Sequence, residues 1–287
     1  CHYLKTKGFE ITTLPVDSQG LIDPNLLEES ITDKTILISI MTSNNEIGSI
    51  EPIKKIGDIA KKNDIIFHTD GVQAFGKIPI NVNELGIDLL SASAHKIYGP
   101  KGVGMLYLRN KGMREGWGKI IEPLMYGGGH ERDLRPSTVN VPAIAAFAKA
   151  AELASNEMES EIPRQTKLRD KIIDRVLEEI EDSYLNGHRT QRLPNNVNLG
   201  FKYIEGESIV LDLDAVGIAA STGSACSSKS LDPSHVLLAI GLTPQDAHGS
   251  LRVSLGRFTS EDDVDYFLQK LPPIISRLRK ISPIKKT

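Results

Sequence analysis

Short runs of apolar and β-branched residues alternate with amphipathic runs along residues 9–108. The apolar runs have the length of strands, whereas the amphipathic runs have the periodicity of helices. The pattern predicts two helices, at 24–31 and about 52–62, and five strands, at 9–16, 35–41, 64–70, 88–93 and 103–108. Strands that alternate with helices in this way indicate a mainly parallel sheet flanked by helices.

The carboxyl-terminal part of the chain has a different order of elements. Residues 141–180 have the pattern of two helices in series, with a break at Pro163, whose missing N–H interrupts helical hydrogen bonding. Further elements are predicted at 195–201 (strand), 207–217 (helix), after Pro233 (helix), at 250–255 (strand) and from Glu261 (helix). We therefore expect an α/β fold in two domains, a large one at 1–155 and a smaller α+β domain at 156–287.

Composition narrows the classes of function. The 287 residues carry a formal net charge of −3, which gives no cationic surplus for binding nucleic acid, and no run approaches the ~20 apolar residues that span a membrane. The two cysteines, Cys1 and Cys226, are too few for a disulfide framework or a protein-only metal cage, which predicts single-thiol chemistry in the cytoplasm. Because Cys1 stands where a helix is ending, we expect an upstream segment to be missing.

Two strand ends carry candidate chemistry. Asp70 closes the predicted strand at 64–70, and Lys96 follows the strand at 88–93. Ligands of open α/β sheets bind beyond the carboxyl ends of strands. Pyridoxal phosphate requires a lysine that forms a Schiff base and a carboxylate beside the pyridinium nitrogen. Taken alone, the two residues would be a solvated lysine and a capping aspartate, but together at two strand ends they favour a shared cofactor site.

The second cysteine lies in an unusual context. Cys226 occurs in the run STGSACSSKSLDPSH, which consists mainly of small polar residues. An unpaired cysteine is more often a small buried hydrophobic residue, but this run has little capacity for burial. We therefore expect an accessible thiol on a mobile loop, as a sulfur-carrying cysteine requires.

Six segments resemble, in this order, the cysteine desulfurases of the NifS/IscS group, which are fold-type I pyridoxal-phosphate enzymes of the class-V aminotransferase family: 41–53, 68–77, 91–104, 127–140, 221–242 and 250–267. The resemblance implies that Lys96 binds the cofactor covalently and that Asp70 faces the pyridine nitrogen. It further implies cofactor contacts from Gln73 and Asn45 at the phenolic oxygen, from Ser93, Ala94 and His95 around the phosphate, and from Thr138 of the other subunit of a homodimer.

The same resemblance implies a reaction. The substrate would be L-cysteine, with its carboxylate bound by Arg252 and Asn45, while Lys96 moves protons and His95 is a candidate acid or base. Cys226 would take the sulfur as a persulfide, release alanine, and pass the sulfur to an acceptor such as an iron–sulfur scaffold protein. No firm metal site is implied, although Cys226 is a candidate transient ligand of an iron–sulfur cluster.

The chain departs from the family in the segment that would reach the partner's phosphate. The family usually has glycine where Asp133 stands and Ser-Gly where Pro136 and Ser137 stand, so we expect weaker phosphate binding. The family's ring-stacking histidine and its phosphate-binding turn would lie upstream of Cys1. Other hypotheses stay open: a selenocysteine lyase or an aminotransferase of the same fold, or a non-catalytic sulfur-trafficking or scaffold protein. A cysteine hydrolase is a weaker alternative, because no His/Asp pairing can be identified around Cys226.

Overall fold

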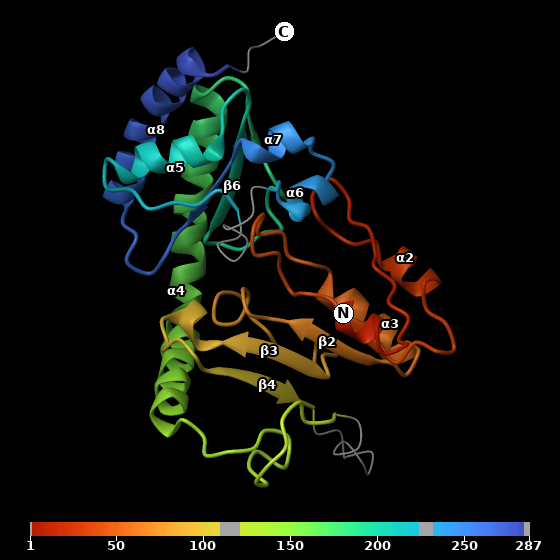
Figure 1. The fold of residues 1–287 in the computed structure, drawn as a ribbon. Helices are drawn as coiled ribbons and strands as arrows, with labels where there is room; N and C mark the ends of the chain where they lie inside the picture. The colour runs from red at the N-terminus through yellow and green to blue at the C-terminus, as the bar shows by residue number, and fades with distance from the viewer. Residues whose placement is uncertain (1, 110–120, 224–231, 284–287) are drawn as a thin grey trace.

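The computed structural model describes residues 2–109, 121–223 and 232–283 (Figure 1). Along the chain it has α1 (His2–Lys5), α2 (Pro24–Glu29), β1 (Leu37–Ser39), α3 (Ile53–Lys62), β2 (Ile66–Asp70), β3 (Leu89–Ser93), the 3-10 turn η1 (Ala94–Ile97), β4 (Gly104–Leu108), α4 (Val141–Glu179), β5 (Ser183–Leu185), β6 (Asn196–Phe201), α5 (Gly206–Asp214), α6 (His235–Ala239), α7 (Pro244–His248), β7 (Ser250–Ser254) and α8 (Glu261–Ile281). Among these described residues, no helix combines the length and the apolar character needed to cross a membrane.

The first sheet has the order β1-β2-β3-β4. Strands β1, β2 and β3 are parallel, and β4 returns antiparallel to β3. The helix α3 has a buried face that includes Ile56, which packs in one core with Phe67 of β2 and Leu90 of β3. The prediction of a mainly parallel sheet flanked by helices is therefore confirmed. Its parallel strands place the ends of β2 and β3 at the same edge of the sheet.

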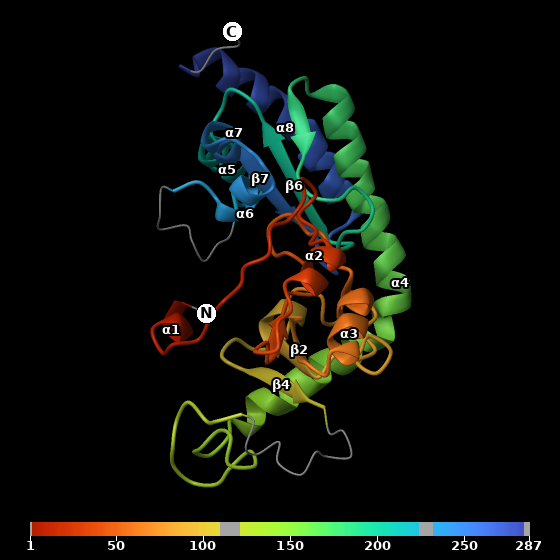
Figure 2. The same cartoon turned by 90° about the vertical axis from the view of Figure 1, so that its right-hand side faces the viewer.

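The second sheet is antiparallel, with the order β5-β6-β7. All six residues of β6 are buried, and the helices α4, α5 and α8 contribute to the core around it. Figure 2 shows this sheet and its helices above the first sheet, with α4 running beside both. This smaller α+β unit agrees with the prediction, whereas the exact boundary at 155/156 stays a prediction.

The predicted break at Pro163 is wrong, because α4 is a single helix of 39 residues with Pro163 inside it. A proline within a helix costs about 3 kcal/mol through its missing N–H and its steric clash. The helix continues because both halves are anchored: Phe147 is buried in the first core, and Ile172 and Val176 are buried in the second. Tertiary packing on both sides outweighs the local preference.

Three other parts of the chain differ from the prediction. Residues 9–16 form no strand; Phe9 is 49% exposed, and Pro15 has no N–H to donate to a ladder. Strand β5 and helix α7 were not predicted, since each is too short for a clear hydrophobic period. Thr243 caps α7 by accepting a hydrogen bond from the N–H of Asp246, which is a local signal that the sequence does carry.

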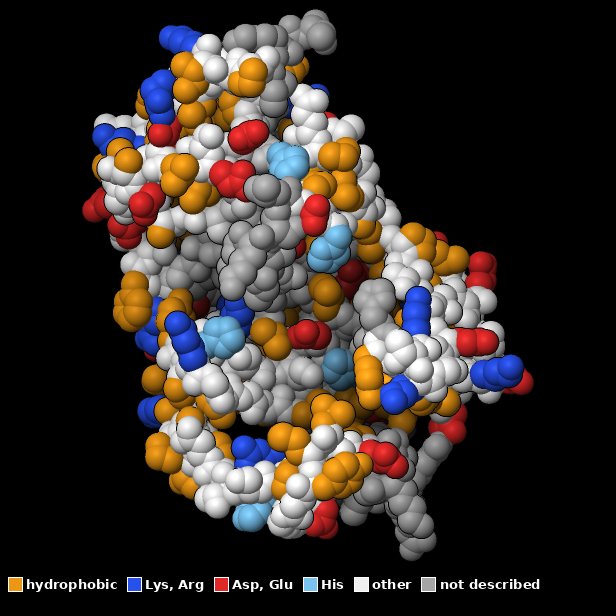
Figure 3. All heavy atoms as spheres, viewed as in Figure 1, with side chains coloured by type: hydrophobic (Ala, Val, Ile, Leu, Met, Phe, Trp, Pro, Cys, Tyr) orange, Lys and Arg blue, Asp and Glu red, His pale blue; other side chains and the backbone are white. Residues whose placement is uncertain are grey.

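On the face drawn in Figure 3, acidic and basic side chains are interspersed over the whole surface. Large apolar side chains are nevertheless exposed just before the segment that carries Thr138. Leu124 is 97% exposed, Tyr126 is 81% exposed, and Met125 beside them is 58% exposed. Apolar side chains clustered in one loop in this way are typical of a contact surface for another protein.

Candidate active site

The predicted cofactor residues lie at the carboxyl ends of two neighbouring strands. Asp70 is the last residue of β2 and pairs in register with Ser91 of β3, which ends at Ser93 and continues directly into η1 with Lys96. The Asp70 carboxylate is exposed at this edge and accepts a hydrogen bond of 2.9 Å from the N–H of Val72. The parallel topology therefore brings the predicted carboxylate and the predicted lysine to one edge of the sheet.

A polar pocket of about 310 Å³ adjoins Lys96. It is lined by four of the predicted residues, Asn45, Gln73, Lys96 and Arg252, and by Leu193, Asn195, Asn196 and Ser254. Residues far apart in the sequence thus converge, from the segments that follow strands of the first sheet and from the second sheet. Asn195 and Asn196 each have a buried side-chain oxygen with no hydrogen-bond partner among the described residues. The mainly polar lining of the pocket favours a polar ligand.

Backbone contacts orient the two predicted substrate-binding residues. Arg252 lies in β7, and its Nη1 donates a 3.1 Å hydrogen bond to the carbonyl oxygen of Asn45. The backbone of Arg252 also forms a β-bridge with the backbone of Ser221. The guanidinium is therefore held beside Asn45 by one hydrogen bond, while the backbone of Arg252 is held by Ser221. A planar, fixed guanidinium is the group that best matches a carboxylate.

The predicted phosphate-binding residues lie at the start of η1. The Ser93 Oγ and the His95 Nδ1 are hydrogen-bonded at 2.7 Å, and both side chains reach solvent. Ala94 between them is fully buried, and its N–H donates to the carbonyl of Val103. Ala94 therefore supports the turn from within the core, while its neighbours carry the polar groups.

Thr138 is exposed in a loop with an unusual backbone. Its carbonyl accepts a hydrogen bond from Arg135, and both Asp133 and Ser137 have left-handed backbone conformations, with φ of 65° and 77°. The resemblance led us to expect glycine at these two positions, and glycine adopts this conformation without a steric cost. Asp133 and Ser137 each have a Cβ atom, so the left-handed conformation has a steric cost at both positions.

Sequence reasoning missed Lys77, which lies beside the predicted site. Lys77 and Lys96 both line a second, larger pocket of about 790 Å³, and the Lys77 ammonium lies 3.5 Å from the Gln73 side-chain oxygen. Burial, and then repulsion from Lys96, lower the pKa of Lys77 to about 8. The spacing of four residues between Gln73 and Lys77 was a signal that the two lie on one face of a helical turn.

Another missed group is the imidazole of His68, two residues before Asp70 on the same face of β2. Its Nδ1 lies 2.8 Å from the Ser39 Oγ, and its Nε2 lies 3.0 Å from the Ser91 Oγ. Burial lowers the pKa of His68, and the charge of Asp70 opposes this shift. The ring is therefore fixed between two hydroxyl groups next to the predicted carboxylate.

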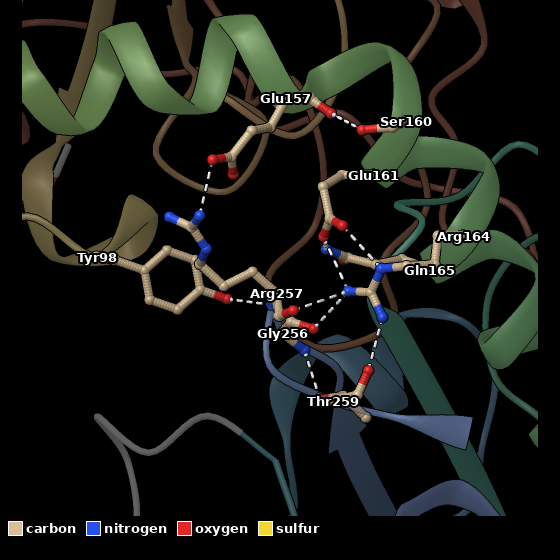
Figure 4. Close-up of polar contacts among 9 residues, drawn as sticks. All are labelled: Tyr98, Glu157, Ser160, Glu161, Arg164, Gln165, Gly256, Arg257 and Thr259. Atoms are coloured by element: carbon tan, nitrogen blue, oxygen red, sulfur yellow. Dashed lines mark hydrogen bonds and ion pairs between the residues drawn. The ribbon is translucent and has the colours of Figure 1, made fainter. Parts of the chain in front are cut away.

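Tyr98 connects the turn of Lys96 to the loop that follows β7 (Figure 4). The Tyr98 hydroxyl accepts a 2.8 Å hydrogen bond from the N–H of Arg257, and the Arg257 guanidinium pairs with Glu157 of α4 at 2.7 Å. The same guanidinium lies over the ring of Phe258, 5.4 Å from its centroid. These contacts hold together the first sheet, α4 and the second sheet.

Arg164 of α4 strengthens the same connection (Figure 4). Its guanidinium pairs with Glu161 and donates hydrogen bonds to three carbonyl groups of the loop, those of Gly256, Arg257 and Thr259. The hydrogen bond from Arg164, with its charge, lowers the pKa of Glu161. The loop after Arg252 is therefore fixed to the helix that spans both cores.

Cys226, the predicted sulfur acceptor, lies outside the described residues. The nearest described residues in the chain are Gly223 and Asp232. Ser221 pairs with Arg252 of β7, and Ser234 begins α6 by accepting hydrogen bonds from the N–H groups of Val236 and Leu237.

Comparisons with known proteins identify the family. The aminotransferase class-V family model matches residues 2–267. The cysteine desulfurase IscS of Dictyoglomus turgidum is 55% identical over 286 residues, which cover 100% of this chain and 71% of that protein. The cysteine desulfurase IscS of Methanosarcina thermophila is 54% identical, over 99% of this chain and 68% of its own length. A solved NifS-like protein is 38% identical, with a TM-score of 0.86 over 96% of this chain and 71% of its own.

Proposed function

Because the chain belongs to the class-V aminotransferase family, and within it to the cysteine desulfurases of the NifS/IscS group, we propose that the pocket at Lys96 binds pyridoxal phosphate and L-cysteine. One observation carries the assignment of residues. Asn45, Gln73, Lys96 and Arg252, which come from four separate segments, line the same polar pocket.

The residues present fit this cofactor chemically. Lys96 supplies the amine, Asp70 supplies a carboxylate at the end of the neighbouring strand, and Gln73 and Asn45 supply amide groups. Ser93 and His95 offer a hydroxyl and an imidazole at the start of η1, which suit a phosphate. When bound, the cofactor supplies an electron sink that stabilises negative charge at the substrate α-carbon.

The chain's own groups have separable tasks in the proposal. Arg252 binds the substrate carboxylate, and its hydrogen bond to the Asn45 carbonyl fixes the plane of the guanidinium. Lys96 removes the proton from the substrate α-carbon and returns a proton to the product. The second lysine, Lys77, donates to the Gln73 side-chain oxygen, which turns the amide nitrogen of Gln73 toward other partners.

Sulfur transfer is assigned to Cys226. Its thiolate attacks the sulfur of bound L-cysteine, an S–S bond forms, and the bond between that sulfur and the substrate β-carbon breaks. The substrate keeps the electron pair of the broken bond, takes up a proton, and leaves as alanine. One cysteine and one thiol thus give one alanine and one persulfide.

We further propose a homodimer that shares its active sites. The exposed apolar residues Leu124, Met125 and Tyr126 precede the loop that carries Thr138. A second subunit that packs on these three residues would bring Thr138 toward the cofactor phosphate bound in that second subunit. An iron–sulfur scaffold as sulfur acceptor, and a cytoplasmic location, also stay predictions.

The test uses the purified protein with pyridoxal phosphate and L-cysteine. Borohydride reduction followed by peptide mapping is expected to place a pyridoxyl label on Lys96, and Lys96→Ala is expected to lose the label and all alanine formation. Cys226→Ser is expected to retain the label and to lose sulfur release. A fully active Cys226→Ser variant would refute the role of the thiol, and a keto acid in place of alanine would indicate an aminotransferase.

A further inference from the structure

Glu46 is a buried carboxylate whose position the predicted site does not explain. It follows Asn45 in the segment between β1 and α3, and it is 1% exposed. Its Oε2 accepts a hydrogen bond of 2.6 Å from the Ser234 Oγ. Ser234 is the capping residue of α6, the first helix after Cys226, so Glu46 holds the end of the segment that follows the cysteine.

The same carboxylate also lies against the segment that precedes the cysteine. A Cβ atom placed on Gly223 would stand 3.3 Å from the Glu46 Oε2, so the Gly223 backbone faces this oxygen closely. The residue before it is tied to β7, because the Thr222 carbonyl accepts a 2.7 Å hydrogen bond from the Ser250 Oγ. Residues 223 and 234, on the two sides of Cys226, therefore both lie close to one carboxylate oxygen, and Ser234 is hydrogen-bonded to it.

The backbone of Glu46 is itself fixed by the side chains of three asparagine residues. Its N–H donates to the Asn44 side-chain oxygen at 2.8 Å, and its carbonyl accepts hydrogen bonds from the side chains of Asn196 and Asn198 at 3.1 and 3.2 Å. Because the backbone is held in this way, the two adjacent side chains of Asn45 and Glu46 can act at different places. Asn45 lines the cofactor pocket, and Glu46 reaches the residues beside the cysteine segment.

We propose that Glu46 is a positioning residue for sulfur transfer, because its carboxylate binds Ser234 and lies against Gly223, on the two sides of Cys226, and so sets how readily Cys226 reaches the substrate sulfur. The inference rests on the proposed function. A tethered nucleophile acts at an effective concentration that depends on where its two ends are held. A hydrogen bond to a buried charged acceptor is strong enough to hold such an end in place.

The variants are Glu46→Ala, which removes the acceptor, and Glu46→Gln, which keeps a weaker one. In the enzyme loaded with pyridoxal phosphate, the change of cofactor absorbance on adding L-cysteine reports the chemistry at Lys96, and persulfide on Cys226 reports the transfer. Glu46→Ala is expected to slow persulfide formation about 10- to 100-fold with the absorbance change retained. Glu46→Gln is expected to lie between this variant and the natural protein.

Glu51→Gln is the matched control. Glu51 is also a buried glutamate of the segment after β1, but its Oε2 accepts from the N–H of Ile22. This variant is expected to leave both rates unchanged. Hydrogen–deuterium exchange at residues 216–223 and 232–240, measured without cofactor or substrate, is expected to be faster in Glu46→Ala and unchanged in the control.

Two outcomes would overturn the proposal. One is unchanged persulfide formation in Glu46→Ala, and the other is an equal loss of the absorbance change and of persulfide, which would mean a merely structural role. If the natural protein itself gives neither signal with L-cysteine, the proposed function is wrong, and the exchange experiment then decides separately whether Glu46 holds the two flanking segments.

Discussion

At the scale of single residues, burial decides which groups have unusual chemistry. Lys77 and Glu51 are ordinary residues in the sequence, and only the fold shows that each loses its solvation. The resemblance selected Asn45, Gln73, Lys96, and Arg252 by motif, and the structure places all four at one pocket. Burial could not be predicted in the same way, because it depends on which segments cover a side chain rather than on its neighbours in the sequence.

Glu51 gives a prediction for the pH dependence of stability. Burial raises its pKa to about 7, so between pH 4.5 and 7 the folded protein binds more protons than the unfolded chain. The stabilisation from this group is present below pH 4.5 and is lost as pH rises to 7. Glu51→Gln is therefore expected to raise the free energy of unfolding at pH 8 by about 2–3 kcal/mol.

Urea unfolding of the natural protein and the variant at pH 5 and pH 8 measures this effect. Glu84→Gln, at an exposed glutamate in the same part of the chain, is the control and is expected to change neither value. If Glu51→Gln is no more stable than the natural protein at pH 8, the raised pKa is wrong.

At the scale of elements, tertiary packing outweighs the helix-breaking effect of a proline, and steric cost accounts for the unusual backbone of the loop that carries Thr138. Pro163 was expected to break a helix, but α4 is anchored in a separate core on each side of it. The strands β2 and β3 could be predicted as short apolar runs that end in polar residues, and β6 and β7 as segments in which apolar residues alternate with other residues. The segment at 9–16 has similar composition, but no neighbouring strand pairs with it, and sequence alone does not show the neighbour.

The loop of Thr138 gives a prediction at this scale. Ser137 has φ of 77°, a conformation that costs a residue with a Cβ atom about 1 kcal/mol relative to glycine. Ser137→Gly is therefore expected to favour the ordered loop and to tighten binding of pyridoxal phosphate about fivefold. Val139→Gly, at a nearby residue without a positive φ, is expected to weaken binding. Equal effects of the two substitutions on the dissociation constant would contradict this explanation.

At the scale of the whole molecule, the site depends on how the two sheets are held together. Lys96 belongs to the first sheet and Arg252 to the second, so their separation is set by the contacts between the two units. Tyr98 and Arg164 provide polar contacts of this kind, and α4 spans both cores. The contacts of Tyr98 and Arg164 could not be predicted from the sequence, because their partners include backbone groups up to 159 positions away.

Tyr98→Phe tests this connection. The substitution removes the hydrogen bond to the Arg257 N–H, and it is expected to cost about 1 kcal/mol of stability. Because the bond joins the turn of Lys96 to the loop after Arg252, the KM for L-cysteine is also expected to rise. Tyr266→Phe is the matched control, since its hydroxyl bonds to the Val216 carbonyl, remote from this turn. A similar rise of KM in both variants would contradict the prediction.

The central claim is that Lys96 and Cys226 act in sequence on one molecule of L-cysteine. The most direct measurement is a single turnover of the enzyme loaded with pyridoxal phosphate, using L-cysteine labelled at sulfur, followed by peptide mapping without reductant. We predict one labelled sulfur on the Cys226 peptide for each alanine released, and neither product in Lys96→Ala. Alanine release with the label absent from Cys226 would contradict the account.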